Sequence, residues 1–254
     1  MTTNSGVRLE SDGPVATVTL CRPGVLNAQT PEMWGTLRDI SRDLPGDIRV
    51  VVVRGEGRAF SAGLDLTTAN GSDGGTFAEL TRLSPEACAD RIAEIQEAFT
   101  WLRRPDLITV AAVQGYAIGA GFQLALACDL RVLATDAQLS MAEVTLGLVP
   151  DLGGTKRLVA LVGYARALEI CVTGRKVGAA EAERIGLANL VVPPDELDGA
   201  THDLVAAVLA GRRDAVVEIK ALLAGAAERS YADQDRAERE AQTRRLHDLA
   251  GVGE

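Results

Sequence analysis

The sequence predicts an α/β protein, because apolar runs typical of strands alternate along the chain with segments of helical spacing. Residues 15–20 (VATVTL) alternate like a half-buried strand. Residues 48–54 (IRVVVVR) form the continuous β-branched run expected of a strand covered on both faces. A chain of 254 residues is long enough to bury a large core, so we expect layers of helices around a sheet.

Two helices between the predicted strands carry the same start signal. Thr30 followed by Pro31 supplies an N-cap and a proline suited to the first helical turn. Ser84 followed by Pro85 repeats this pattern, and apolar residues recur at helical spacing after both prolines. We therefore expect helices that begin at Pro31 and Pro85.

The segment from 107 to 128 is uncharged and long enough to cross a bilayer. Its two glutamines and three glycines divide it into pieces of different periodicity, which argues against a membrane span. We interpret it as a strand over 107–113 and a helix over 120–127, followed by a further strand over 130–133.

Residues 66–83 contain Asn-Gly and Asp-Gly-Gly turn signals and are expected to form a long loop that covers a site or moves. They include the glycosylation sequon Asn70-Gly71-Ser72, which matters only in a secreted protein.

The chain becomes helical and strongly charged after Pro193-Pro194. We expect a core over 1–194 and a helical region over 195–254 that packs on the core or on a neighbouring subunit. A solvated helix face is the simplest role for its charges.

Composition narrows the classes of function. Thirty-five acidic residues against 26 basic ones give a net charge of −9, and the pI near 4.9 argues against nucleic acid or an anionic membrane as partner. Four dispersed cysteines without a Cys-x-x-Cys pair suggest neither a disulfide framework nor a metal site. The N-terminus shows no secretory signal, so we expect a cytoplasmic protein.

Common catalytic motifs are weak or missing. His202 and His247 both lie in the C-terminal helical region, and no Gly-x-Ser-x-Gly elbow accompanies them. Gly119-x-Gly121 begins like a dinucleotide fingerprint, but Leu124 occupies the third glycine position. A histidine-activated nucleophile and a nicotinamide site are therefore disfavoured.

What remains is main-chain and carboxylate chemistry. Residues 115–121 (GYAIGAG) join a predicted strand to a helix that begins near Ala120, whose first amides are unpaired and lie at the positive end of the helix dipole. Residues 58–65 (RAFSAGLD) turn at small residues after another strand. Two such amides aimed at one thioester oxygen would stabilise an enolate, each by roughly 3 to 4 kcal/mol. Alternatively, these glycines serve only tight turns.

Four segments resemble, in the same order, the enoyl-CoA hydratase/isomerase or crotonase family. They are CRPGVLNAQT (21–30), RAFSAGLDL (58–66), VQGYAIGAGFQLALACDLRV (113–132) and AQLSMAEVTLGLVPDLGGTKRL (137–158). The resemblance implies a crotonase-like spiral of ββα units with a C-terminal helical trimerisation region, and a homotrimer or homohexamer. It also implies an acyl-CoA thioester substrate, so that coenzyme A enters as part of the substrate and no cofactor is bound permanently.

By resemblance, the two thioester-binding amides are those of Leu64 and Ala120. The segments 22–28 and 61–66 are implied to border the adenine and pantetheine parts of coenzyme A. The residues implied to line coenzyme A or the substrate are Arg22, Leu26, Ala28, Ser61, Ala62, Gly63, Asp65, Leu66 and Gly119.

One departure from the family pattern concerns the catalytic acids. Hydratases of the family carry two glutamates that position and activate water; the second falls on Glu143, but the first falls on Gln123. Glutamine can orient a water and cannot take its proton. Asp151 lies where several isomerases and diene isomerases of the family place an acidic base. The implied catalytic set is Glu143, Asp151 and Gln123, which slightly favours a proton shift over hydration.

Plainer roles stay open for all three residues. Glu143 could cap a helix or pair with an arginine, Asp151 could be the N-cap of a helix over 153–162, and Gln123 could be a satisfied polar group on an inner helix face. The rival function is a non-catalytic acyl-CoA binder that has lost one acid.

Overall fold

The computed structural model describes residues 5–69 and 75–251. Its main sheet has the strand order β1-β2-β3-β4-β6-β9. Only β1 is antiparallel to its neighbour, and the other pairs are parallel. These strands are β1 (Val7–Asp12), β2 (Val15–Leu20), β3 (Val50–Gly55), β4 (Ile108–Val113), β6 (Leu130–Ala134) and β9 (Leu190–Val192).

A smaller sheet of order β5-β7-β8 lies beside the first and is built from β5 (Tyr116–Ile118), β7 (Gln138–Ser140) and β8 (Val177–Gly178). The helices of the body are α1 (Pro31–Asp43), α2 (Leu66–Ala69), α3 (Thr76–Arg82), α4 (Pro85–Thr100), α5 (Ala120–Ala127), α6 (Gly154–Val162), α7 (Tyr164–Thr173) and α8 (Ala179–Arg184). Short 3-10 helices are η1 (Pro23–Val25), η2 (Trp101–Arg103), η3 (Ala142–Leu146) and η4 (Pro194–Glu196).

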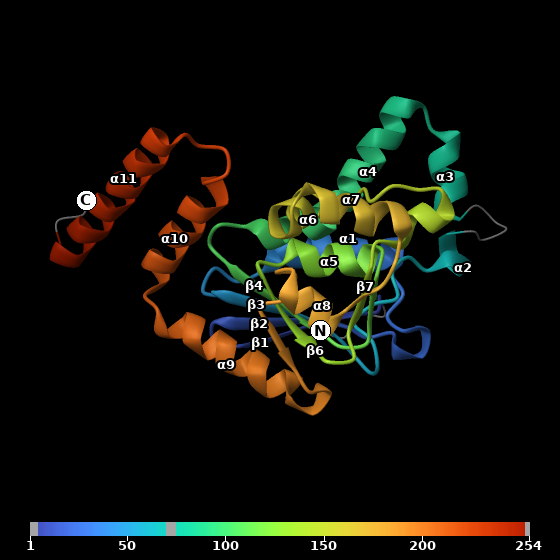
Figure 1. Ribbon diagram of the computed structural model, residues 1–254, viewed down its shortest axis with the longest axis horizontal. Helices are drawn as coiled ribbons and strands as arrows, with labels where there is room; N and C mark the ends of the chain where they lie inside the picture. The colour runs from blue at the N-terminus through green and yellow to red at the C-terminus, as the bar shows by residue number, and fades with distance from the viewer. Residues whose placement is uncertain (1–4, 70–74, 252–254) are drawn as a thin grey trace.

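Strand β3 contributes to two cores, as its continuous apolar run predicts. Val51 and Val53 pack into the larger core, with α1, α4 and α5. Val50 and Val52 point to the opposite face of the sheet, which α9 (Leu197–Ala210) covers. Figure 1 shows α9 on one side of the sheet and α1 and α5 on the other.

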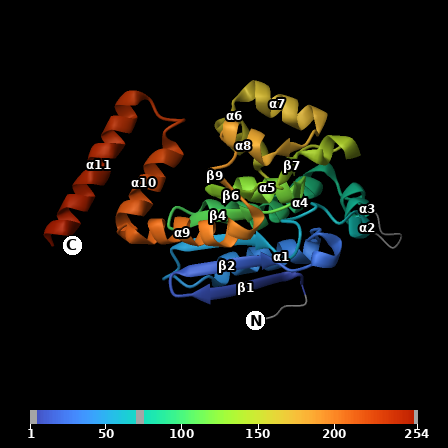
Figure 2. The ribbon, with the colours of Figure 1, turned by 60° about the horizontal axis from the view of Figure 1, so that its bottom comes forward.

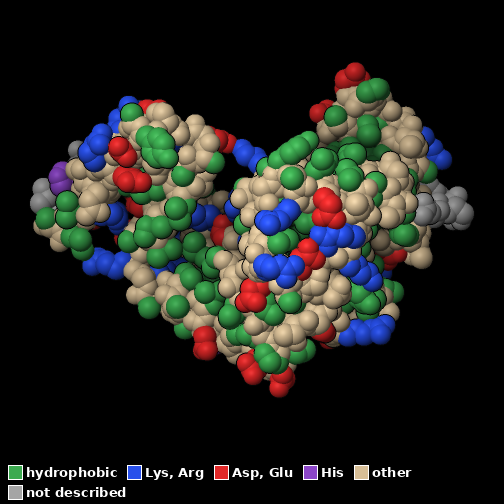
Figure 3. Space-filling view, viewed as in Figure 1, with side chains coloured by type: hydrophobic (Ala, Val, Ile, Leu, Met, Phe, Trp, Pro, Cys, Tyr) green, Lys and Arg blue, Asp and Glu red, His purple; other side chains and the backbone are tan. Residues whose placement is uncertain are grey.

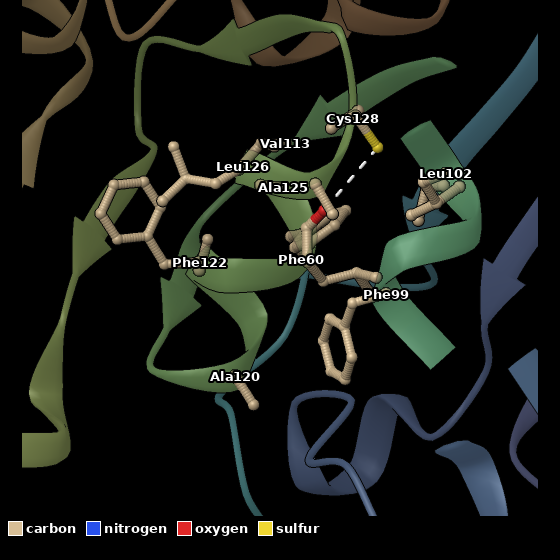
Figure 4. Packing of buried hydrophobic residues seen from close by; sticks show 14 of the residues in the cluster. Phe60, Phe99, Leu102, Val113, Ala120, Phe122, Ala125, Leu126 and Cys128 are labelled. Atoms are coloured by element: carbon tan, nitrogen blue, oxygen red, sulfur yellow. Dashed lines mark hydrogen bonds between the residues drawn. The ribbon is translucent and has the colours of Figure 1, made fainter. Parts of the chain in front are cut away.

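Helix α5 lies at the centre of the larger core, and every one of its residues is buried. Phe60, Phe99 and Leu102 pack around it, and Figure 4 shows them close to the helix that runs from Ala120 toward Cys128. The end of α5 at Ala120 is thereby held by apolar packing in a fixed place relative to the sheet.

The two remaining helices form a hairpin that extends from the body (Figures 1 and 2). They are α10 (Arg213–Gly225) and α11 (Tyr231–Ala250). Lys220 of α10 donates 2.7 Å hydrogen bonds to Asp129 and to the carbonyl of Leu107, which fixes the base of the hairpin to the body.

Local signals predicted the helix starts correctly. The Thr30 and Ser84 hydroxyls accept hydrogen bonds from the amides of Met33 and Ala87, with a proline next in the chain at both sites. The strands expected near 15–20, 48–54, 107–113 and 130–133 and the helix over 120–127 are also present. None of the helices in the described part of the chain combines the length and apolar character that a membrane span requires.

The prediction of a continuous loop over 66–83 is wrong. Asp65 accepts hydrogen bonds from the amides of Thr67 and Thr68, which supports α2, and α3 lies against α4, where Glu79 pairs with Arg91. The sequon Asn70-Gly71-Ser72 lies outside the described residues.

Candidate active site

The two turns predicted over residues 58–65 and 115–121 lie against each other. They are called the first corner, at Gly63, and the second corner, at Gly119. The Ser61 amide donates a 2.8 Å hydrogen bond to Tyr116, and the Ile118 amide donates a 3.0 Å bond back to Ser61. Gly63 has φ +87°, and a Cβ at this position would lie 2.4 Å from the Ile118 oxygen and 3.6 Å from the Ala120 nitrogen. Only glycine allows these two backbone segments to approach so closely.

Each corner presents an amide without an acceptor. Gly119, with φ +51°, precedes α5, and Ala120 is the first residue of that helix. Neither the Leu64 nor the Ala120 amide donates to any acceptor among the described residues. Unpaired amides at adjacent corners are the arrangement that an oxyanion site requires.

A buried hydrogen-bond network holds the first corner in shape. The Ser61 hydroxyl donates to the Asn27 carbonyl at 2.8 Å and accepts from the Gln29 side chain and the Gly63 amide. Gln29 in turn accepts from the Trp34 indole at 2.8 Å. Because the Ser61 side chain is fully buried and bonded to protein groups, the structure gives it a positioning role, and its contact with a ligand stays a prediction.

The sequence analysis did not single out Asn27 and Gln29. Asn27 has a left-handed backbone with φ +55°, and its side-chain amide donates to the carbonyls of Glu56 and Ala59. The available signal was a pair of amide side chains inside one of the resemblance segments.

Arg22 and Asp65, both implied to line coenzyme A, pair with each other. The Arg22 guanidinium donates to Asp65 at 2.9 Å and to the Ala28 carbonyl at 2.6 Å. Hydrogen bonds from Thr67 and Arg22 hold the pKa of Asp65 below its usual range. Arg22 also lines an open hollow of about 650 Å³ beside the start of α1.

The other residues implied to line coenzyme A lie nearby on the same segments. Leu26 has a left-handed backbone, and its carbonyl accepts from the Ala62 amide at 2.8 Å. Leu66 begins α2 and is exposed. The two segments are therefore hydrogen-bonded to each other beside the Gly63 corner.

Glu143, on η3, brings a carboxylate to the second corner. Its Oε1 atom lies 3.4 Å from where a Gly119 Cβ would be and accepts a 2.7 Å hydrogen bond from Gln123. Its Oε2 atom is buried and has no hydrogen-bond partner among the described residues. Burial raises the pKa of Glu143, and the nearby charge of Asp151 acts in the same direction.

Asp151 lies in the turn before α6 and is partly buried, which raises the pKa of its carboxyl group. Gln123 joins this turn to Glu143, because its carbonyl oxygen accepts from the amides of Leu152 and Gly154 at 2.9 and 3.3 Å. The structure thus brings Glu143, Asp151 and Gln123 together.

Two of the plainer roles do not match the contacts. Among the described residues Glu143 forms no ion pair with an arginine, and α6 begins after Gly153 without a side-chain cap, so Asp151 is not its N-cap. Gln123 is a satisfied polar group inside the core, and its partner is the candidate acid Glu143.

The comparisons with known proteins agree with this geometry. Residues 10–250 match the family model described as enoyl-CoA hydratase/isomerase. This chain belongs to that family. The resemblance inferred from the four segments is therefore confirmed, and the chain is an enzyme of the enoyl-CoA hydratase/isomerase family.

A relative with a specific name is the short-chain-enoyl-CoA hydratase of Clostridium acetobutylicum, which is 32% identical over 203 residues, covering 79% of this chain and 74% of that protein. A solved structure of a candidate enoyl-CoA hydratase from Thermobifida fusca YX in complex with CoA is 48% identical, with a TM-score of 0.90, over 97% of this chain and 95% of that one. The same Thermobifida protein has been solved with acetoacetyl-CoA, with a TM-score of 0.91 over 96% of both chains. The crotonase-like fold is confirmed by these neighbours.

Proposed function

We propose that this enzyme moves the double bond of an unsaturated acyl-CoA thioester by a 1,3-proton shift. The amides of Leu64 and Ala120 hold the thioester oxygen while Glu143 removes a proton from the α or γ carbon. The electron pair of that C–H bond enters the enolate, and Glu143 returns the proton at the other carbon. The observation that carries the proposal is one carboxylate beside two adjacent acceptor-free amides.

Coenzyme A enters this proposal as part of the substrate. The Thermobifida neighbour was solved with CoA and with acetoacetyl-CoA, which supports an acyl-CoA ligand at the equivalent place. We propose that the segments 22–28 and 61–66, together with Gly119, border it. The Arg22 side chain is partly exposed and lines the open hollow, where it could meet the anionic groups of coenzyme A.

Hydration of the double bond is the second candidate. It is favoured by the name of the Clostridium relative, a short-chain-enoyl-CoA hydratase. Gln123 weighs against hydration, since an amide cannot take a proton from water. Asp151 would then have to act as the second carboxylate beside Glu143.

One experiment separates these reactions. The protein is incubated in D₂O with 2-enoyl-, 3-enoyl- and dienoyl-CoA esters, and the products are followed by mass and by double-bond position. We expect deuterium at carbon and a moved double bond without the mass gain of one water. Because general acid–base catalysis typically contributes at least about 100-fold, Glu143→Gln is expected to slow the reaction by that factor or more.

Glu97→Gln is the matched control, since Glu97 is exposed on α4 and, within the described part of the chain, pairs only with Arg42. Conversion of crotonyl-CoA to the hydroxy product, unchanged by Asp151→Asn, would overturn the isomerase proposal. Tight acyl-CoA binding without turnover, insensitive to Glu143→Gln, would indicate a binding protein instead.

We also propose that the chain assembles as a homotrimer or homohexamer through the region 195–254. Exposed apolar side chains on α10 and α11 support this assembly. They are Ile219, Leu223, Leu246 and Leu249.

A further inference from the structure

The orientation of the Gln123 side-chain amide is fixed by its neighbours. The amides of Leu152 and Gly154 can only donate, so they must face the Gln123 oxygen, at 2.9 and 3.3 Å. The Gln123 NH₂ group is therefore turned toward Glu143 and donates to its Oε1 atom at 2.7 Å. A Cβ at Gly154 would lie 2.9 Å from the Gln123 Cγ atom, so the glycine leaves room for this arrangement.

This contact divides the Glu143 carboxylate into two unequal oxygens. Oε1 is occupied by Gln123, whereas Oε2 is buried and has no hydrogen-bond partner among the described residues. An unpaired buried carboxylate oxygen costs free energy unless a ligand or a proton satisfies it. Oε2 is thus the oxygen that no described protein group holds, while Oε1 lies nearer the Gly119 corner, 3.4 Å against 3.9 Å from where a Gly119 Cβ would be.

The other ionisable groups that influence Glu143 come from two neighbouring elements. Asp151 of the turn before α6 opposes ionisation of Glu143 by like charge. Cys171 of α7 lies close enough for the Glu143 charge to help raise the pKa of its thiol. Hydrogen bonds from the backbone amide of Glu143 itself and, to a smaller extent, from the Gln123 side chain lower the pKa of Glu143 and favour its ionised form.

We propose that Gln123 is a positioning residue that fastens Glu143 to the main chain of the 152–154 turn and, by donating to Oε1, favours the ionised carboxylate that takes the substrate proton. This inference rests on the proposed function and specifies how Glu143 is held in place as its base. A carboxylate at position 123 would keep the bonds to the turn, because it can accept from both amides, but it could not donate to Glu143 while ionised.

Gln123→Glu keeps the acceptor for the turn, removes the donor to Glu143 and places a second carboxylate beside it. Two carboxylates within hydrogen-bond distance share one proton, so Glu143 becomes a free base only at higher pH. We expect the acid limb of kcat/KM against pH, measured with 3-hexenoyl-CoA, to move upward by about one pH unit or more. The melting temperature is expected to stay close to that of the parent chain at acidic pH, where the pair holds its proton.

Gln123→Met is the second variant and removes both the donor and the acceptor. It is expected to shift the acid limb in the same direction and also to lower the melting temperature, because the amides of Leu152 and Gly154 lose their acceptor. If Gln123 only supports the turn, Gln123→Met loses stability but keeps the parent pH profile, and that result would overturn the inference, because Gln123→Met adds no charge.

A ¹³C NMR titration of the Glu143 carboxyl, assigned with Glu143→Gln, gives a readout that needs no turnover. The pKa of Glu143 is expected to rise in both Gln123 variants. If the parent chain does not move the double bond, the proposed reaction fails, and this titration still decides whether Gln123 controls Glu143. A Glu143 titration in Gln123→Met that matches the parent chain overturns the inference.

Discussion

Gly63 is the residue on which the geometry of the amide pair depends most directly. An alanine there would adopt φ +87° at a cost of roughly 1 to 2 kcal/mol, and its Cβ would lie 2.4 Å from the backbone oxygen of Ile118, which is held in β5. The corner must move, and with it the Leu64 amide. Loss of one oxyanion donor typically costs about 100- to 1,000-fold.

We therefore expect Gly63→Ala to lower kcat by about 100-fold or more and to reduce the melting temperature. Steady-state kinetics and thermal unfolding measure the two effects. Gly46→Ala is the matched control, since a Cβ at Gly46 meets nothing within 4 Å. A Gly63→Ala enzyme with the parent kcat would show that the corner does not position the thioester.

Glu143 also has a stability cost that its function explains. Burial raises its pKa above the unfolded value, so the native state favours the protonated acid. This contribution to stability is fully present below the unfolded pKa and is lost as pH rises through the folded pKa. When ionised, Glu143 is a buried carboxylate whose Oε2 atom has no hydrogen-bond partner among the described residues.

Glu143→Gln is consequently expected to stabilise the protein at neutral pH, because it removes the charge that burial disfavours. Its amide oxygen can still accept from Gln123. The gain should shrink at acidic pH, where the parent Glu143 is protonated. Urea unfolding at both pH values measures it, and a gain independent of pH would assign the effect to packing.

Signals within a short stretch of sequence, such as an N-cap or a β-branched run, predicted the elements that such signals are sufficient to form. The N-cap and proline at Thr30-Pro31 are sufficient to start α1, and the β-branched run of β3 is sufficient for a strand covered on both faces. Strands β7, β8 and β9 were missed because they have only two or three residues and exist through pairing with distant segments. Helix α2 was missed because turn signals outweighed the cap that Asp65 provides. Helix α3 was missed because it begins after Gly75 without a side-chain cap.

In the candidate site, too, the local features could be predicted from the sequence and the contacts between distant segments could not. Gly63 and Gly119 lie inside recognisable segments, and their positive φ values follow from the tight corners. The bond from Gln123 to Glu143 joins residues of different elements, and the bonds to Leu152 and Gly154 depend on where the turn before α6 comes to lie. Such contacts arise from tertiary packing, which the spacing of residues along the chain does not encode.

The α10–α11 hairpin gives the whole molecule a surface that a single chain leaves uncovered. Its base is fixed, because Lys220 bonds to Asp129 and Arg213 donates to the Gly46 carbonyl. Beyond the base, Leu223 is 71% exposed, and hydrophobic side chains are visible over this region in Figure 3. On the body, Tyr164 is also 71% exposed. Exposed apolar surface on a rigid arm is typical of an interface.

We expect light scattering to give the mass of a trimer or hexamer. Leu223→Asp is expected to shift the protein to smaller species, because a charge buried in an apolar interface is costly. Leu83→Asp places the same charge on an exposed leucine at the end of α3 and should leave the mass unchanged. Because Leu223 is 71% exposed in the single chain, the dissociated Leu223→Asp chain should retain its fold by circular dichroism. A parent chain that is monomeric at micromolar concentration would contradict the assembly and would require the hairpin to have a different partner.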